Sequence, residues 1–179
     1  MIRRTAAALL ILMALAAVFA ACSGGQTDSP PSGKPNARPT IIRTPTPVAA
    51  TPEEAVRQLN NAECEAVVQQ DIDRLQGIWA ADGVIVDANH TPTNTSDDVT
   101  WKTWDAIRDR YVNIVFPSSP TFCEHPNVQV NVTDANSATA STGVKIGATN
   151  CTDCNQWVFK KTTDGWRIST MTYNLNAQK

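Results

Sequence analysis

The prevailing spacing of apolar residues differs on the two sides of the prolines at 117 and 120. Before them, apolar residues recur three to four positions apart, which is typical of helices that bury one face. After them, segments such as NVQVNV alternate apolar and polar side chains, which is typical of half-buried strands. Helices followed by hairpin-forming strands predict an α+β fold, in which one strongly twisted antiparallel sheet wraps around the long first helix.

The helical spacing predicts three helices. The first follows Pro52 in EEAVRQLNNAECEAVVQQ, with Glu53 and Glu54 in the first turn, where negative charge is favourable. The second is DIDRLQGIWA, with Asp71 as its N-cap. The third is WDAIRDRYVNIVF, which Pro117 terminates. Each presents an apolar stripe that needs a sheet to cover it.

The remaining segments predict strands and one long loop. A short strand is expected in DGVIVD, and others in NVQVNV, SATASTGVKIGA, QWVFKK and WRISTMTYNL. Residues 88–103 are polar and have no apolar period, so we expect a loop that acts as a mobile flap or a functional lid.

The N-terminus indicates export. Two arginines precede a short apolar run, which predicts a signal peptide over residues 1–21. The run ends in VFAAC, which resembles the lipobox of bacterial lipoproteins and makes Cys22 the expected lipidation site and membrane anchor. The alternative is an ordinary secreted protein with a spare cysteine. Residues 22–51 are rich in Pro, Thr and Ser and predict a disordered linker, which leaves one domain at 52–179.

The charge of the domain argues against nucleic-acid binding. Acidic residues outnumber basic ones in this part of the chain, and its longest basic cluster is the pair Lys160 and Lys161. Nucleic-acid-binding domains carry a basic patch or stripe, which this sequence lacks.

Four cysteines in the domain predict two disulfides, because an even number in an exported chain usually forms bonds. Three connectivities are possible. The preferred one joins Cys151 to Cys154 at a hairpin tip and Cys64 to Cys123. CTDC together with Cys123 and His125 would also suit zinc, and the CxxC spacing would suit a redox motif, but neither is preferred and no metal is expected.

The order of these motifs resembles a known superfamily. QDIDRLQGIWAADGVIVD, followed by a helix with DAIRDRY and a final hairpin with FKKTTDGWRI, is similar to the nuclear transport factor 2-like superfamily, which includes ketosteroid isomerases and SnoaL-type polyketide cyclases. The resemblance covers about residues 52–176. It implies a cone-shaped fold of about three N-terminal helices on a strongly curved sheet.

The same resemblance implies a catalytic candidate. Asp87 falls at the position of the isomerases' proton-abstracting carboxylate. The family's tyrosine position falls near Glu63, and its second acid falls on Trp157 or Val158, so the groups that stabilise an enolate are missing. A cyclase needs only an acid, often with a histidine, which would be Asp87 and His90. The alternative is structural, since DANHTP is a good turn sequence.

Aromatic residues around the third helix indicate a binding pocket. Trp101 and Trp104 flank the long loop and open the helix, which in this fold lies beside the mouth of the cone. With Tyr111 and Tyr173 they form the expected ligand-binding set. Packing against the helix face is the alternative for Tyr111.

Two arginines of the third helix are expected to face solvent. Arg108 and Arg110 lie near Asp105 and Asp109 at spacings that allow ion pairs on a helix surface.

These observations predict an envelope lipoprotein whose domain binds a small apolar or amphipathic molecule, or a partner, with no demonstrated catalysis and no cofactor. An enzyme of the lyase, cyclase or isomerase type with Asp87 as general base is the first alternative. A structural module that forms homodimers through its open sheet face is the second.

Overall fold

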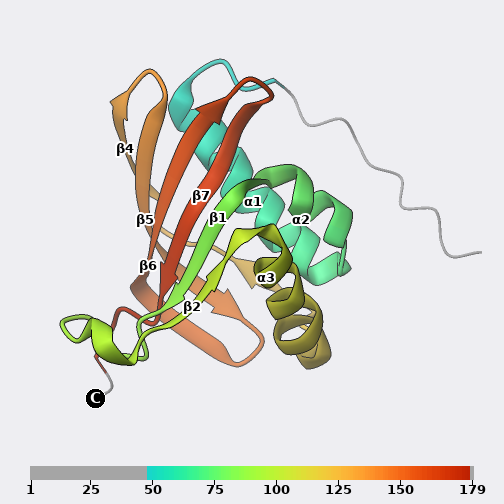
Figure 1. Ribbon diagram of the computed structural model, residues 1–179, viewed down its shortest axis with the longest axis vertical. Coiled ribbons are helices and arrows are strands. Elements are labelled where there is room, and N and C mark those ends of the chain that lie inside the picture. Colours follow the sequence, from blue (N-terminus) through green and yellow to red (C-terminus); the bar gives the residue numbers. More distant parts are fainter. Residues whose placement is uncertain (1–47, 178–179) are drawn as a thin grey trace, which may run out of the picture. The chain divides into compact units, whose positions relative to one another are not determined.

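The computed structural model describes residues 48–177, in which three α-helices pack on one seven-stranded sheet (Figure 1). The helices are α1 (Pro52–Gln69), α2 (Ile72–Ile78) and α3 (Thr103–Arg110), followed by the π-helix η2 (Tyr111–Val115) and the short 3-10 helix η3 (Phe116–Ser118). The strands are β1 (Trp79–Asp87), β2 (Val99–Lys102), β3 (Cys123–Glu124), β4 (Gln129–Asp134), β5 (Ser137–Ile146), β6 (Thr149–Thr162) and β7 (Gly165–Tyr173).

The predicted signal peptide, Cys22 and nearly all of the predicted linker lie outside the described residues. Within residues 48–177, no helix has the length and apolar character needed to cross a membrane.

The first two helices begin at side-chain caps, Thr51 for α1 and the predicted Asp71 for α2. Thr51 Oγ1 accepts a hydrogen bond of 3.2 Å from the Glu54 backbone N–H, and Asp71 Oδ1 accepts one of 3.0 Å from the Arg74 backbone N–H. A side-chain acceptor at this position satisfies an N–H group that has no partner within the helix. Pro52 fits the first turn of α1 because its missing N–H would have no helical acceptor there.

The sheet has the strand order β2-β1-β7-β6-β5-β3, with β4 also paired to β5. All pairs are antiparallel except β1 with β7, which run parallel, so the sheet is mixed. The sequence pattern predicts an antiparallel sheet because the later strands follow one another through hairpins. It does not show that β7, the last strand, pairs with β1, the first.

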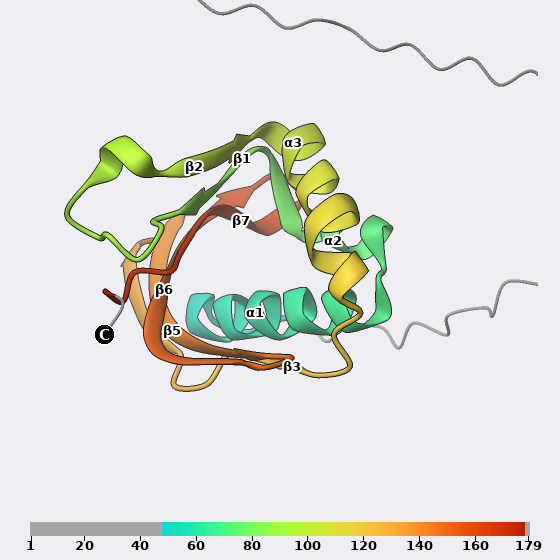
Figure 2. The ribbon, with the colours of Figure 1, turned by 90° about the horizontal axis from the view of Figure 1, so that it is seen from below.

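The sheet curves around α1, as Figure 2 shows. Its register shifts within the β5–β6 pair, between Thr142 and Val144, and within the β6–β7 pair, between Val158 and Phe159. Bulges of this kind bend a sheet. Gly143 lies in the first shift, where a Cβ would approach Cys151 O to 2.6 Å, so no larger residue fits this bend.

The second helix is shorter, and the first strand longer, than the sequence pattern predicts. Trp79, expected on the helical stripe, is the first residue of β1 and pairs with Ile168 of β7. The register shifts between Trp79 and Val84, and at Gly83 a Cβ would lie 2.9 Å from Ala80 O. This irregularity hides the alternation by which the start of a strand is recognised.

Residues 88–103, expected to be a loop, contain the 3-10 turn η1 (Thr95–Asp97) and the strand β2. β2 pairs with β1, and Val99 lies opposite Asp87. It is an edge strand with only Trp101 half-buried, which explains why its sequence is too polar to be recognised as a strand.

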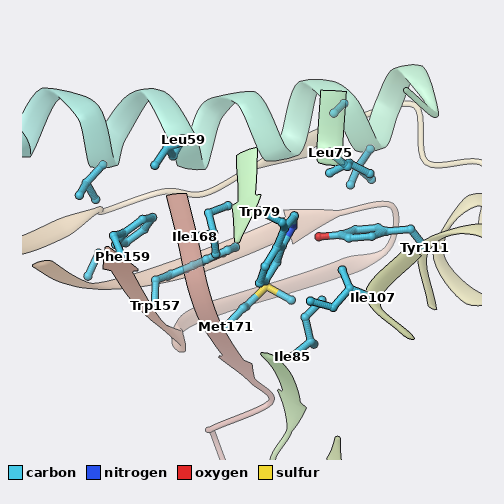
Figure 3. Close-up of a cluster of buried hydrophobic side chains, with 14 of the residues drawn as sticks. Leu59, Leu75, Trp79, Ile85, Ile107, Tyr111, Trp157, Phe159, Ile168 and Met171 are labelled. Atoms are coloured by element: carbon cyan, nitrogen blue, oxygen red, sulfur yellow. The ribbon is translucent and has the colours of Figure 1, made fainter. Parts of the chain in front are cut away.

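The core lies between α1 and the concave face of the sheet (Figure 3). Its fully buried members come from α1, from α2 and α3, and from the central strands, so the helices and the sheet share one core. The largest are Trp157, Tyr111, Phe159, Leu75, Ile85, Ile107 and Ile168.

The disulfides join Cys64 to Cys123 and Cys151 to Cys154, which is the preferred pairing. The first ties α1 to β3. The second lies within β6 rather than at the hairpin tip, because the turn between β5 and β6 falls at residues 147–148. Two disulfides are consistent with an oxidising compartment outside the cytoplasm.

Candidate functional site

Glu63 is a carboxylate buried on the inner face of α1. It lies four positions from Leu59 and four from Val67, so the helical period places all three on the buried stripe. Its exposed fraction is 5%. A buried carboxylate is costly unless hydrogen bonds compensate for the lost water, so its partners define the site.

Two buried side chains provide those partners. The Tyr111 hydroxyl donates to Glu63 Oε1 at 2.8 Å, and His125 Nε2 lies 3.0 Å from Oε2. An ionised carboxylate only accepts hydrogen bonds, so this contact suits a form of His125 that carries a proton on Nε2. His125 also packs edge-on against Trp157, with ring centroids 5.0 Å apart. A phenol, a carboxylate and an imidazole thus form one buried chain of hydrogen bonds, the Tyr111–Glu63–His125 triad.

The first disulfide lies directly beside the triad. One potential ligand atom from each of Glu63, Cys64, Cys123 and His125 lies within 4.8 Å of the others. These residue types would suit zinc, but the two sulfurs are bonded to each other, and a disulfide sulfur is not a thiolate ligand. In this form the cluster acts as a cross-link next to a hydrogen-bonded carboxylate.

The third helix changes from α to π geometry at Tyr111. The π segment adds a residue to a turn, and such segments are frequent at functional sites. Here Arg110 and Tyr111 are consecutive, and both are buried. Arg110 was expected to face solvent and is instead directed inward. Arg108 is the exposed arginine, with Asp109 Oδ1 2.9 Å from Nη2 and Asp105 Oδ1 4.0 Å from Nη1.

A cavity of about 490 Å³ lies between the helices and the sheet. Apolar side chains form much of its wall, and polar side chains from α1, α3, the π-helix and the last strands reach it at separate points. Its apolar members include Val67, Ile114, Val115, Val144, Ile146 and Met171, and its polar members include Glu63, Arg110, Tyr111, Asn155, Tyr173 and Asn174. The exposed lining residues Ser118, Ala148 and Thr149 indicate where the cavity meets solvent.

The four aromatic residues expected to bind ligand are divided between the cavity and its support. Tyr111 and Tyr173 line the cavity. The Trp101 ring lies under the Arg110 guanidinium, 5.2 Å from ring centroid to guanidinium carbon. Trp104 is half-buried against the hydrophobic core. Neither tryptophan is among the described residues that line this cavity.

Asp87 and His90, the catalytic candidates, lie at the end of β1 and in the turn after it. Asp87 Oδ1 accepts hydrogen bonds from the Asn89 backbone N–H at 2.9 Å and from Asn174 Nδ2 at 2.8 Å. His90 Nδ1 lies 2.9 Å from Asn176 O. Among the residues described around the cavity, Glu63 is the only carboxylate in the wall, and Asp87 is not part of it. Asp87 therefore caps a turn and joins it to the end of β7.

Burial and nearby charges raise the pKa values of both tyrosines that line the cavity. Burial raises the pKa of Tyr111 well above 10, and the Glu63 charge raises it further against the opposing effect of Arg110. Burial also raises the pKa of Tyr173, with Arg110 lowering it and Asp87 raising it. Both phenols are therefore neutral hydrogen-bond donors at physiological pH.

We expect the folded protein to resist ionisation of its two tyrosines. A free tyrosine is half ionised at about pH 10. Because the folded-state pKa values lie above the unfolded ones, the stabilisation is complete below about pH 10 and is lost as pH rises through the folded-state values. Phenolate absorbance should appear only at higher pH or on unfolding, and unfolding by guanidinium should restore normal titration. A folded protein with one tyrosine titrating near pH 10 would contradict this, and Tyr111→Phe would show which one.

Sequence reasoning missed three of these residues. Glu63 was considered as a mismatch for a tyrosine, His125 as a possible zinc ligand, and Arg110 as a surface residue. Position gave a signal for two of them. Glu63 falls on the apolar stripe of its helix, and Arg110 lies three residues after the buried Ile107. A charged residue on a buried stripe indicates a functional site.

A curved mixed sheet with helices on its concave face, enclosing a cavity with a buried carboxylate, defines a cone-type ligand-binding or catalytic domain. The model of the SnoaL-like domain family matches residues 56–173. The chain belongs to this family.

Solved structures show the same fold at low sequence identity. A nuclear transport factor 2-like protein with a cystatin-like fold from Novosphingobium aromaticivorans is 20% identical with a TM-score of 0.52, covering 67% of this chain and 79% of that chain. LinA is 16% identical with a TM-score of 0.53, covering 67% and 82%. The hexachlorocyclohexane dehydrochlorinase LinA-type3 from Novosphingobium barchaimii LL02 is 15% identical with a TM-score of 0.52, covering 67% and 83%.

These likenesses establish the nuclear transport factor 2-like fold, and a fold does not fix a reaction. No curated protein sequence matches the chain significantly.

Proposed function

We propose that the domain binds a small, largely apolar molecule inside the cone. The observation that carries this proposal is the cavity of about 490 Å³, in which apolar walls surround a few converging polar groups. Small-molecule sites in proteins typically have volumes of about 300–1,000 Å³ and this division between apolar walls and orienting polar groups. Glu63 and Tyr111 are the polar groups most firmly fixed by hydrogen bonds.

Blocking the cavity tests the proposal. Ile146→Trp places a larger ring on the cavity wall, whereas Val158→Trp adds the same ring at an exposed position of β6 that is not among the described lining residues. We expect the neutral apolar dye N-phenylnaphthylamine to bind the wild-type protein and Val158→Trp with similar affinity. Ile146→Trp should bind it at least about tenfold more weakly, as loss of apolar burial predicts. Equal dye binding by Ile146→Trp, with an unchanged circular dichroism spectrum, would reject the cavity as the site.

Protein purified from its own host provides a second measurement. A native mass spectrum of the wild-type protein should contain a retained small molecule, and its mass would identify the ligand class.

A second candidate function is elimination chemistry with Glu63 as general base, in place of Asp87. The buried triad favours it, because each Glu63 oxygen accepts one hydrogen bond and keeps a lone pair, and the carboxylate lines the cavity. In an elimination, a base takes a proton from carbon, the C–H electrons form a double bond, and the leaving group departs with its bonding electrons. Here Glu63 would take the proton.

Hexachlorocyclohexane, the compound after which one of the similar proteins is named, is a suitable probe. Elimination would release one chloride for each double bond formed. Glu63→Gln, which keeps the shape but not the basicity, should abolish chloride release, whereas Asp87→Asn should retain it. No chloride release by the wild-type protein would reject elimination of this substrate, and equal release by Glu63→Gln would reject Glu63 as the base.

We further propose that the domain is held outside the cytoplasm by a lipid on Cys22. The sequence VFAAC and the two disulfides support this location. Labelling with a radioactive fatty acid in the native host should mark the wild-type protein and not Cys22→Ala. Equal labelling of the variant would reject the anchor.

A further inference from the structure

Arg110 is a buried cation without an ion-pair partner among the residues that the structure describes. Its exposed fraction is 9%, and within residues 48–177 no carboxylate oxygen lies within 4 Å of its guanidinium. Its Nε–H is buried and has no hydrogen-bond acceptor in this part of the chain. Arginines this deeply buried are normally paired, because the interior replaces water poorly around a charge.

Three aromatic rings hold the guanidinium in place. Its central carbon lies 4.7 Å from the ring centroid of Tyr173, 5.2 Å from that of Trp101 and 5.7 Å from that of Tyr111. Ring faces attract a cation, but they carry no net charge and accept no strong hydrogen bond from a guanidinium fork. The rings fix the orientation of Arg110, and the Tyr173 hydroxyl interacts with its guanidinium, but none of these three side chains supplies a negative charge.

Arg110 also lines the cavity. Of the described lining residues, only Arg110 and Glu63 carry charge, and both charges act on Tyr111. Glu63 is already hydrogen-bonded to Tyr111 and His125, and it forms no ion pair with Arg110. Asp87 and Arg110 shift the pKa of Tyr173 in opposite directions. Asp87 already accepts hydrogen bonds from Asn89 and Asn174. An anion entering the cavity would meet one free cation and one carboxylate.

We propose that Arg110 binds the carboxylate of a small amphipathic acid whose apolar body fills the cavity. This inference rests on the proposed binding function. A guanidinium fork matches the two oxygens of a carboxylate, and the bond is strong where water is excluded. The Glu63 charge in the same cavity disfavours a second anionic group, so the structure favours a monocarboxylate over a phosphate monoester or a dicarboxylate.

Three ligands of one chain length test this selectivity. Octanoate, octan-1-ol and octylamine carry an anionic, a neutral and a cationic head on similar apolar bodies. Titration calorimetry of the full-length protein should show octanoate binding at least about tenfold more tightly than octan-1-ol, the effect of a charge-assisted hydrogen bond. Octylamine should bind most weakly, because it places a second cation beside Arg110. This comparison needs only the wild-type protein.

Arg110→Gln and Arg108→Gln form a matched pair on one helix, because Arg108 is exposed and pairs with Asp109. Arg110→Gln should lose about tenfold or more in affinity for octanoate and change little for octan-1-ol. Arg108→Gln should bind all three ligands as the wild type does.

The outcomes separate the two proposals. Equal affinity of the wild-type protein for octanoate and octan-1-ol, or unchanged octanoate binding by Arg110→Gln, would overturn carboxylate recognition while leaving the cavity as a binding site. Absence of binding by all three ligands and by N-phenylnaphthylamine would overturn the binding function as well.

Discussion

Glu63→Ala is expected to lower the free energy of unfolding by about 3–5 kcal/mol, because each buried hydrogen-bonding group left without a partner costs about 1–3 kcal/mol. The substitution leaves the Tyr111 hydroxyl and His125 Nε2 without their acceptor in a region that water does not reach freely. It also removes side-chain volume from the inner face of α1. Urea denaturation followed by circular dichroism measures the change.

Two further variants identify the cause. Glu65→Ala lies on the exposed side of the same helix, where Glu65 pairs with Arg74, and should cost no more than about 1 kcal/mol because exposed ion pairs contribute little. Glu63→Gln keeps the side-chain volume and one acceptor oxygen. Its loss in free energy of unfolding should therefore lie between the losses of the two alanine variants. Equal losses for Glu63→Ala and Glu65→Ala would show that the triad does not stabilise the fold.

The second large effect is expected from the disulfides, which differ in the length of chain they close. Cys64 and Cys123 are 59 residues apart, which corresponds to about 4 kcal/mol of unfolded-state entropy. Cys151 and Cys154 are 3 residues apart, which corresponds to about 1.5–2 kcal/mol. Removing the first bond by Cys64→Ala with Cys123→Ala should therefore destabilise the protein more than removing the second by Cys151→Ala with Cys154→Ala.

The stabilities of the two double variants can be compared directly. Each double variant loses one buried and one half-buried sulfur. Because both cysteines of the bond are replaced, neither variant has an unpaired thiol left from that bond. A larger loss of stability for the Cys151 and Cys154 double variant, measured by urea denaturation under oxidising conditions, would show that the loop length closed by each bond does not control its effect.

The sequence predicts the fold well where local patterns are regular. The start of α1 at Pro52, the Asp71 cap of α2, the alternation of β4 and β5 and the final hairpin all follow from short-range periodicity and turn residues. β2 and the start of β1 were not predicted, because an edge strand can be polar and a bulge interrupts alternation. The parallel pairing of β1 with β7 depends on contacts between the two ends of the domain, which no local pattern records.

The site was less predictable than the fold because its residues come from separate elements. Glu63 is on α1, Tyr111 is on the π-helix and His125 follows β3, so no spacing in the sequence places them together. Arg110 and Arg108 both lie near acidic residues, and only the three-residue spacing from Ile107 to Arg110 distinguishes them in the sequence. The change to π geometry after the buried Arg110 is not recorded by any periodic pattern in the sequence.

The Cys64–Cys123 bond lies one residue from Glu63 and two from His125, so the cross-link that joins α1 to β3 also aligns two members of the triad. In the chain before oxidation, these two residues belong to elements that only noncovalent packing holds together. The bond and the contact between Glu63 and His125 link the same two elements side by side, so oxidation of these two cysteines is expected to stabilise the domain and the position of the cavity's carboxylate together.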